Sequence, residues 1–258
     1  MSELQTDPAK SLFSRAGRSV LEAVVRNAGG RRILRAVQTV EPTLVGAYSV
    51  SDYPRHLTDS KFVEAEKLTR PYTLVDVLRR HELWVMVGQS AKLGNGNILE
   101  VGVCRGGTGL LIAEAMRHFG VSGTLYLADT FAGVVKVGEN DSSYTGGEHA
   151  DTSLEQVEDL FRTQQHDVRI LTGIFPDETG HLFDGTIKLL HIDVDIYQSA
   201  RDIVEWAIDR IVTGGIVIFD DYGFSGTDGI ARLCEEYELD DRFIFLSNVN
   251  GHAILIKR

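Results

Sequence analysis

The chain has 258 residues, of which 43% are hydrophobic and 24% charged, and its net charge is −11. This composition is that of a globular protein with a substantial core, and the negative charge argues against a general nucleic-acid-binding protein, which needs a basic surface. No run reaches the ~18 apolar residues of a membrane-spanning helix, and two cysteines are too few for a disulfide framework. We therefore expect a protein of the reducing cytoplasm that binds neither nucleic acid nor membrane.

The first 70 residues differ from the rest of the chain. Residues 1–40 hold seven basic and three acidic side chains, a net charge of +4, which leaves −15 for the remainder. Residues 10–41 have the pattern of basic amphipathic helices broken at Gly29-Gly30, and residues 41–71 look irregular, with three prolines. We predict a helical extension over 1–70 that serves as a lid, a substrate wall or an oligomer contact, or lies as a solvated peripheral helix. A homo-oligomer is expected.

After a helix predicted over 72–89, helical and strand patterns alternate. Short apolar runs predict strands at 98–101, 124–128, 168–171, 188–193 and 215–220. Helical patterns fall at about 108–119, 153–164 and 199–211, the last closed by Gly214-Gly215. A helix at 227–238 then precedes two strands, 242–246 and 253–257, that are spaced as a hairpin.

Strands that alternate with helices predict right-handed crossovers and a parallel sheet. The terminal hairpin predicts that the last strand runs antiparallel to its neighbours, which is the arrangement of the class I methyltransferase sheet and not of ordinary dinucleotide folds. We therefore predict one α/β, Rossmann-like domain over residues 71–258, with a seven-stranded, mostly parallel sheet.

A glycine-rich turn follows the first predicted strand, in the segment Glu100-Val-Gly-Val-Cys-Arg-Gly-Gly-Thr-Gly109. Gly102, Gly106 and Gly107 allow the backbone to approach a ligand closely. The spacing is not G-x-G-x-x-G, because Cys104 stands where the second glycine would be. Glu100 suits a ligand that carries a cationic amino acid better than it suits a pyrophosphate. A purely structural turn is the alternative.

Two later strand ends extend this predicted cofactor site. Asp129 follows the second strand, where an acid usually binds the hydroxyls of a ribose; a turn or cap aspartate is the alternative. Phe175, after the third strand, could pack on an adenine ring or be a core residue.

Acidic residues end the next two predicted strands. Asp193 ends one, and Asp220 and Asp221 end the other, so three carboxylates should meet at one sheet edge, where open α/β folds bind ligands. Such carboxylates repel one another unless a cation or proton lies between them, and Mg²⁺ prefers oxygen ligands. We predict a magnesium site, with helix capping as the alternative. Asp195 could lie in the second shell or cap the following helix.

The segment 134–152 is polar, glycine-rich and unusually long for a connection in a compact domain. We expect it to order over the acceptor as a lid. Tyr144, His149, Tyr222 and His252 are the candidate substrate contacts.

The chain carries, in this order, the glycine turn, Asp129-Thr-Phe-Ala-Gly, Gly173-Ile-Phe-Pro-Asp, Asp193-Val-Asp-Ile-Tyr-Gln-Ser and Gly214-Gly-Ile-Val-Ile-Phe-Asp-Asp-Tyr222. Together these motifs resemble the macrocin O-methyltransferase family. Its members methylate sugar hydroxyls of antibiotics and include a novobiocin-type enzyme. The resemblance covers about 71–258, and Pro71-Tyr72-Thr-Leu is similar to that family's pre-sheet segment. It implies S-adenosylmethionine and Mg²⁺ as cofactors. The implied metal ligands are Asp193, Asp220 and Asp221.

The resemblance implies Asp193 as the general base, and a histidine is the alternative. The residues predicted to bind the cofactor are Tyr72, Glu100, Gly102, Gly106, Gly107, Asp129, Thr130, Phe175 and Asp193. The implied activity is O-methylation of a sugar hydroxyl on a glycosylated natural product. A catechol-like acceptor is the first alternative, although Ile196 stands where catechol enzymes have a lysine. A metal-dependent glycosyltransferase would use Asp193-Val-Asp195, but would leave Asp220-Asp221 and the glycine turn unexplained.

Overall fold

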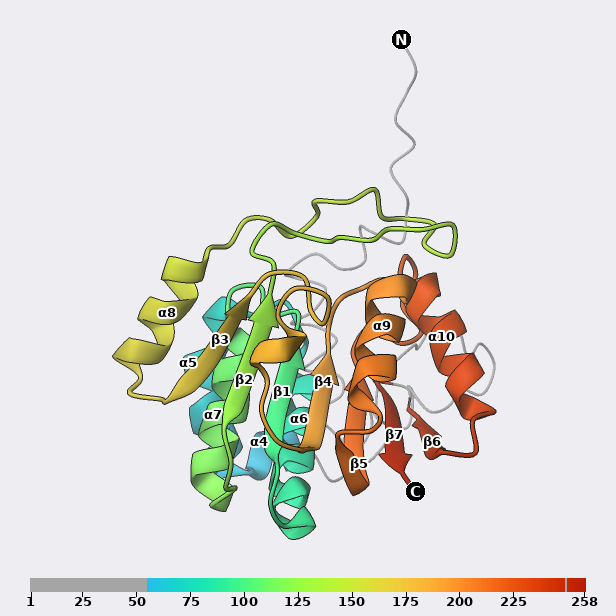
Figure 1. Ribbon diagram of the computed structural model, residues 1–258. Helices are drawn as coiled ribbons and strands as arrows, with labels where there is room; N and C mark the ends of the chain where they lie inside the picture. Colours follow the sequence, from blue (N-terminus) through green and yellow to red (C-terminus); the bar gives the residue numbers. More distant parts are fainter. Residues whose placement is uncertain (1–54, 249) are drawn as a thin grey trace, which may run out of the picture. The chain divides into compact units, whose positions relative to one another are not determined.

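The computed structural model describes residues 55–248 and 250–258, and these form one compact α/β unit (Figure 1). The basic helices predicted within residues 10–41 lie outside the described residues. Seven strands form a single sheet in the order β3-β2-β1-β4-β5-β7-β6. The strands are β1 (Asn97–Val101), β2 (Leu125–Asp129), β3 (Val168–Thr172), β4 (Ile187–Ile192), β5 (Ile211–Phe219), β6 (Phe243–Ser247) and β7 (Ala253–Lys257).

The first five strands pair in parallel, and β7 is antiparallel to both β5 and β6. The prediction of a mostly parallel sheet with an antiparallel last strand is therefore confirmed. The ladder continues to Phe219 opposite Ala253, so Asp220 and His252 leave neighbouring strand ends.

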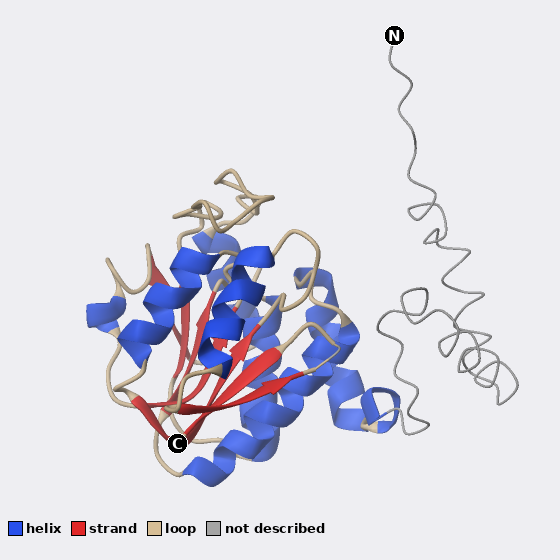
Figure 2. Cartoon of the chain, turned by 90° about the vertical axis from the view of Figure 1, so that its right-hand side faces the viewer, coloured by secondary structure: helices blue, strands red, loops and turns tan. Residues whose placement is uncertain are grey.

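Helices cover both faces of the sheet (Figure 2). They are α4 (Arg55–Thr58), α5 (Ser60–Thr69), α6 (Val77–Ser90), α7 (Gly107–Phe119), α8 (Leu154–Thr163), α9 (Tyr197–Ala207) and α10 (Asp228–Glu238), with 3-10 turns η2 (Arg70–Tyr72), η3 (Ala91–Leu93) and η4 (Gly180–Leu182). Alternate strand residues supply two cores: Ile98 and Leu127 pack with α5 to α8, while Leu99 and Tyr126 pack with α9. None of the described helices is long and apolar enough to cross a membrane.

Two local predictions were wrong. Residues 60–69 are helical and not irregular: Asp59 caps α5 by accepting hydrogen bonds from Lys61 N and Phe62 N, and Phe62 is fully buried. Gly214-Gly215 does not close a helix, because α9 ends at Ala207 and both glycines lie inside β5. In both cases tertiary contacts decide the structure, with α7 for α5 and with β4 for β5, and they outweigh the local glycine and proline signals.

The ends of β1, β2, β4 and β5 reach the same edge of the sheet, and the segment 134–152 runs across it (Figure 1). The strand ends that bear the predicted cofactor and metal motifs therefore lie along one edge.

Candidate active site

The glycine turn packs tightly against its surroundings, which explains its composition. Gly102 has φ of 92°, and a Cβ there would lie 1.8 Å from the carbonyl oxygen of Asp193. A Cβ on Gly107 would lie 2.6 Å from the backbone of Tyr72. The turn is thereby pressed between the end of β4 and the pre-sheet segment, which brings the cofactor and metal motifs together.

Asp129 organises this turn from the end of β2. Its Oδ2 accepts hydrogen bonds from Val103 N at 2.7 Å and Cys104 N at 2.8 Å, and its Oδ1 accepts one from Phe131 N at 2.7 Å. An ionised carboxylate has about four acceptor positions, so Asp129 can still bind one ligand hydroxyl. Its turn role and its predicted ribose role are compatible.

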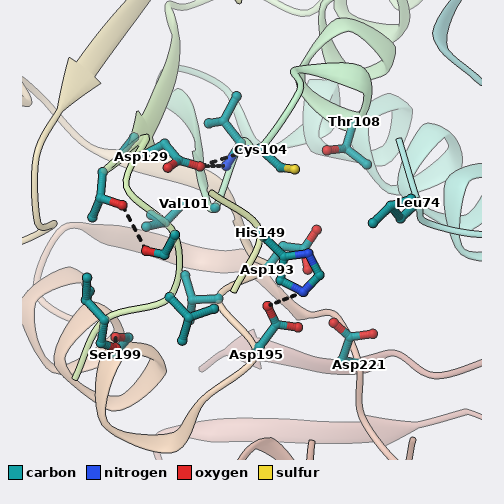
Figure 3. A pocket seen from close by; sticks show the side chains of 18 of the residues that line it. Leu74, Val101, Cys104, Thr108, Asp129, His149, Asp193, Asp195, Ser199 and Asp221 are labelled. Atoms are coloured by element: carbon teal, nitrogen blue, oxygen red, sulfur yellow. Dashed lines mark hydrogen bonds and ion pairs between the residues drawn. The ribbon is translucent and has the colours of Figure 1, made fainter. Parts of the chain in front are cut away.

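A cavity of about 360 Å³ opens beside the turn (Figure 3). The predicted site residues that line it are Tyr72, Gly102, Asp129, Thr130, Tyr144, His149, Phe175, Asp193 and Asp221. Phe175 is also a core residue: it is 4% exposed and packs edge-on against Trp206. One cavity therefore joins the glycine turn to the acidic residues.

Asp193, Asp195 and Asp221 form a half-buried acidic group, with one carboxylate oxygen from each lying within 4.8 Å of the others. Burial and the charge of Asp221 raise the pKa of Asp195 to about 7. Burial and the charges of Asp220 and Asp221 raise the pKa of Asp193 well above its ordinary value. Carboxylates that raise one another's pKa in this way are stabilised in the ionised form when a cation binds between them.

The trio that meets thus differs from the predicted one by a single residue. Asp195, predicted as a second-shell or capping residue, belongs to the group, whereas Asp220 lies with His191 and His252. The interpretation of Asp195 as a helix cap is wrong, since α9 has Ile196 at its N-cap and receives its capping carboxylate from Asp141 of the 134–152 segment.

Backbone strain gathers at this cavity. Four of its lining residues other than glycine have positive φ angles: Cys104, His149, Asp195 and Asp221. Such conformations cost free energy for residues with a Cβ, and they persist where the surrounding structure enforces them, often at functional sites. At Asp221 the positive φ of 61° turns the chain immediately after Asp220, so the two neighbouring carboxylates occupy different environments.

Arg79 is a cavity residue that the sequence analysis missed. It extends from α6, where its side chain is 9% exposed, and its Nη1 donates to Asp220 and to Asp221, the latter at 2.8 Å. Burial alone would lower the pKa of Arg79, but the charges of Asp220 and Asp221 outweigh it and raise that pKa. No local motif marks this arginine as a cavity residue, because Asp220 and Asp221 lie more than 140 residues away from it in the sequence.

The 134–152 segment is fastened to the sheet edge by polar contacts. Asp141 is 8% exposed and accepts a hydrogen bond from Tyr197 N at 2.9 Å, at the first turn of α9. Lys136 pairs with Asp177 at 2.8 Å and Asp202 at 2.6 Å. Ser142 donates to Asp228 at the start of α10.

These contacts place two side chains of the segment beside the acidic group. The Tyr144 hydroxyl hydrogen-bonds to Asp195, and burial together with that carboxylate raises the pKa of Tyr144. His149 Nε2 lies 4.0 Å from Asp195 Oδ2 (Figure 3). Both predicted lid contacts therefore face the cavity, and Asp195 is the group they approach.

Other predicted residues do not reach the cavity. The Tyr222 ring packs edge-on against Phe245, and His252 is fully buried against Glu82. Their predicted role as substrate contacts is not supported by this geometry. Glu100 is fully buried and pairs with His191 at 2.9 Å, and Gly106 and Gly107 also lie behind the lining. Direct cofactor contacts from these three stay predictions.

Comparison with known proteins agrees with this geometry. The model of the macrocin-O-methyltransferase (TylF) family matches residues 58–244, which is more than half of the chain. The chain belongs to the macrocin-O-methyltransferase family. The family resemblance predicted from the sequence is thereby confirmed, and the match includes α5, which the sequence analysis had not recognised as a helix.

Two curated O-methyltransferases align with the chain. The tetracenomycin 4'-O-methyltransferase of Streptomyces olivaceus, which acts on a dimethoxyrhamnosyl derivative, is 32% identical over 62% of this chain and 64% of its own length. The demethyldecarbamoylnovobiocin O-methyltransferase of Streptomyces niveus is 33% identical over 49% and 53%. The chain thus spans less than two thirds of either relative.

The solved structure of the O-methyltransferase NovP has a TM-score of 0.59 to this chain at 25% identity, and covers 72% of this chain and 82% of its own. The class I S-adenosylmethionine-dependent methyltransferase fold of this family member is therefore confirmed.

Proposed function

We propose that the protein is an S-adenosylmethionine-dependent O-methyltransferase that methylates a sugar hydroxyl of a glycosylated natural product, with Mg²⁺ at the acidic group. The observation that carries the proposal is the single cavity that holds Asp129 and the glycine turn at one side and Asp193, Asp195 and Asp221 at the other. Its volume lies within the range of ~300–1,000 Å³ for small-molecule sites.

The cofactor is assigned to the side of the cavity formed by the glycine turn. Gly102 and Cys104 offer backbone close to the ligand, Asp129 has acceptor capacity left for a ribose hydroxyl, and Phe175 supplies an aromatic wall. Tyr72 is 40% exposed and lines the same side, so its ring can cover the ligand. This leaves the acidic side for the acceptor.

The residues fit a divalent cation. Asp193, Asp195 and Asp221 offer three oxygen ligands, and hard oxygen ligands with room for water or substrate suit Mg²⁺. When bound, the ion would lower the pKa of an acceptor hydroxyl and orient it. Asp220, which was also predicted as a ligand, lies next to this group and accepts from Arg79 and from Asp221 N.

Methyl transfer needs an in-line approach of the acceptor oxygen to the sulfonium methyl. The new O–CH₃ bond forms as the CH₃–S bond breaks, both electrons of that bond pass to sulfur, and S-adenosylhomocysteine leaves. The hydroxyl proton must pass to a base. The resemblance implies Asp193, and we propose Asp195 in its place, because the lid residues Tyr144 and His149 approach this carboxylate. Holding the reactants in line supplies much of the rate enhancement.

A sugar is the acceptor class that the site and the relatives favour. Both curated relatives are named for methylation of glycosylated antibiotics or their precursors. Ile196 is fully buried at the N-terminus of α9, so it brings no cation to the acceptor as the lysine of catechol enzymes would. The 134–152 segment lines the cavity with Tyr144 and His149, together with Val134 and Val135.

The test is methyl transfer from radiolabelled S-adenosylmethionine to a panel of rhamnosyl and noviosyl glycosides and to a catechol, with and without chelator. We expect transfer to a glycoside that stops in chelator and returns with Mg²⁺. Transfer to the catechol alone would overturn the acceptor class, and full activity in chelator would overturn the metal role. Calorimetry with S-adenosylhomocysteine tests the cofactor separately.

A further inference from the structure

Two large apolar side chains are exposed at the rim of the cavity, although its acidic side is strongly polar. Leu74 is 67% exposed and Phe224 is 44% exposed, and both line the cavity. A third exposed lining residue, Tyr72, belongs to the proposed cofactor side. Single exposed apolar residues are ordinary on a protein surface, but several around one cavity indicate a surface that contacts a ligand.

Phe224 is held at a defined place beside the acidic group. The carbonyl oxygen of Asp221 accepts hydrogen bonds from Phe224 N at 3.4 Å and from Thr227 Oγ1 at 2.7 Å, which closes the loop between β5 and α10. The guanidinium carbon of Arg79 lies 4.6 Å from the centre of the Phe224 ring, and a Cβ on Gly251 would overlap the ring. The ring is therefore fixed by its neighbours, and its exposed part is free to contact a ligand.

Leu74 comes from a different part of the chain, the segment between η2 and α6. Asp76 of this segment caps α6, and its carboxylate accepts a hydrogen bond from Arg79 Nε at 2.8 Å. Arg79 thus joins the segment that carries Leu74 to the loop that carries Phe224. Figure 3 shows Leu74 at the opposite side of the cavity from Asp129, away from the proposed ribose contact.

The charges of the lining disfavour an acceptor that carries phosphate groups. Arg79 and Arg105 are the arginines of the lining within the described residues, and neither is left unpaired. Arg79 pairs with Asp221 at 2.8 Å, and Arg105 pairs with Asp151. The Mg²⁺ proposed at the acidic group already faces three carboxylates. A diphosphate would therefore meet more negative than positive charge, whereas a neutral acceptor avoids this repulsion.

We propose that Leu74 and Phe224 form an apolar subsite for the aglycone of the acceptor. The acceptor is then a neutral glycoside whose sugar is attached to an apolar ring system, and not a nucleoside diphosphate sugar. The inference rests on the proposed function, because it takes the acidic group as the place where the sugar hydroxyl reacts. With the cofactor at the glycine turn, the group attached to the sugar extends over Leu74 and Phe224, where its apolar surface is removed from water.

The subsite also gives this reaction a place in a sequence of reactions. A free or nucleotide-bound sugar lacks the apolar part that Leu74 and Phe224 bind. Glycosyl transfer to the aglycone must therefore supply the substrate, and methyl transfer follows it.

The experiment measures binding to the full chain in the presence of S-adenosylhomocysteine and Mg²⁺. Calorimetry gives the Kd of three derivatives of one sugar: 2-naphthyl α-L-rhamnoside, methyl α-L-rhamnoside and thymidine diphosphate rhamnose. We expect the naphthyl glycoside to bind roughly 10- to 100-fold more tightly than the methyl glycoside, as burial of an apolar group predicts. The nucleotide sugar should bind most weakly of the three.

Phe224→Ser and Leu74→Ser should each remove much of the preference for the naphthyl glycoside, and leave the Kd values of the methyl glycoside and of S-adenosylhomocysteine unchanged. Phe224→Tyr should keep the preference. The matched control is Leu239→Ser, since Leu239 is 86% exposed and lies outside the lining. A naphthyl glycoside that binds no more tightly than the methyl glycoside, undetectable binding included, overturns the proposal. So does a nucleotide sugar that binds most tightly, or a preference that survives both serine variants.

Methyl transfer to the same compounds separates this proposal from the proposed function. If the naphthyl preference depends on Phe224 but no glycoside is methylated, the proposed function fails and the subsite stands. Equal kcat/KM for the naphthyl and methyl glycosides overturns the subsite and leaves the sugar O-methyltransferase activity in place.

Discussion

The two halves of the sheet edge use their acids in opposite ways. At the end of β2, Asp129 accepts three backbone amides and thereby shapes the glycine turn. At the ends of β4 and β5, Asp193, Asp195 and Asp221 face one another, and burial and mutual repulsion raise the pKa values of the first two. Asp129 is therefore satisfied by backbone amides, whereas in the second half Arg79 pairs with Asp221 and the pKa values of Asp193 and Asp195 stay raised.

The difference shows why similar strand-end aspartates have different consequences. A carboxylate satisfied by the backbone stabilises a turn and offers a spare acceptor to a neutral ligand such as a ribose. Ionised carboxylates that lie close together repel one another until a cation or an acceptor proton binds, so binding relieves that repulsion. We expect substitutions in the first half to act on cofactor affinity and substitutions in the second to act on turnover.

The largest expected effect is from Asp195→Asn. A carboxamide cannot take the acceptor proton, so kcat should fall by ~10²–10⁴, the usual contribution of a general base. The measurement is steady-state transfer of labelled methyl, with calorimetry of S-adenosylhomocysteine alongside. Asp240→Asn, at a surface pair with Arg242, is the matched control and should leave kcat unchanged. A loss of cofactor affinity in Asp195→Asn as large as the loss of kcat would contradict the different roles of the two halves.

Asp129→Ala should weaken the cofactor and not the chemical step. It removes a charge-assisted contact to a ribose hydroxyl and the acceptors of three turn amides, and we expect a loss of ~1.5–3 kcal/mol, or roughly 10- to 150-fold in Kd. Calorimetry measures the affinity, and kcat at saturating cofactor should stay within a few-fold. Unchanged affinity would reject the assignment of this side of the cavity.

Asp141→Ala should release the lid from α9. The buried carboxylate accepts hydrogen bonds from Tyr197 N and Gly138 N, and its loss removes ~1.5–3 kcal/mol of charge-assisted bonding. We expect a higher acceptor KM with nearly unchanged cofactor affinity, and faster hydrogen exchange across 138–148. Glu139→Ala, an exposed neighbour, is the control. Equal exchange in the variant and the native chain would show that the lid is held by other contacts.

The smallest effect concerns the turn at the lid tip. The amide and hydroxyl of Thr145 and the amide of Gly146 donate to Glu148, which lowers the pKa of Glu148 to about 2. Because the folded pKa is depressed, the turn is supported above the ordinary value of 4.5 and loses that support as the pH falls through about 2. NMR of the Thr145 amide should follow this titration, and Glu148→Gln should abolish it.

Much of the fold follows from the sequence because it depends on local periodicity. Apolar runs of the right length, separated by amphipathic helices, predicted all seven strands to within a few residues. Gly214-Gly215 and α5 were predicted wrongly because their structure depends on distant segments. β5 pairs with β4 at Ile211 and again from Ile216 onward, with a register shift between, and α5 buries Phe62 against the α7 face. Local composition does not indicate which distant segments pack against a given stretch of chain.

The sequence by itself determined the parallel sheet, its antiparallel last strand and the edge at which the acids meet, because strand direction places every carboxyl end on one side. Only the tertiary structure decided which acids meet. Positive φ angles at Asp195 and Asp221 bring these two beside Asp193 and leave Asp220 with His191 and His252. Arg79 and Glu82 lie on α6, more than 100 residues away in the sequence, and they contact Asp220 and His252, respectively. Side-chain direction at strand ends depends on such contacts, and they form only once the chain has folded.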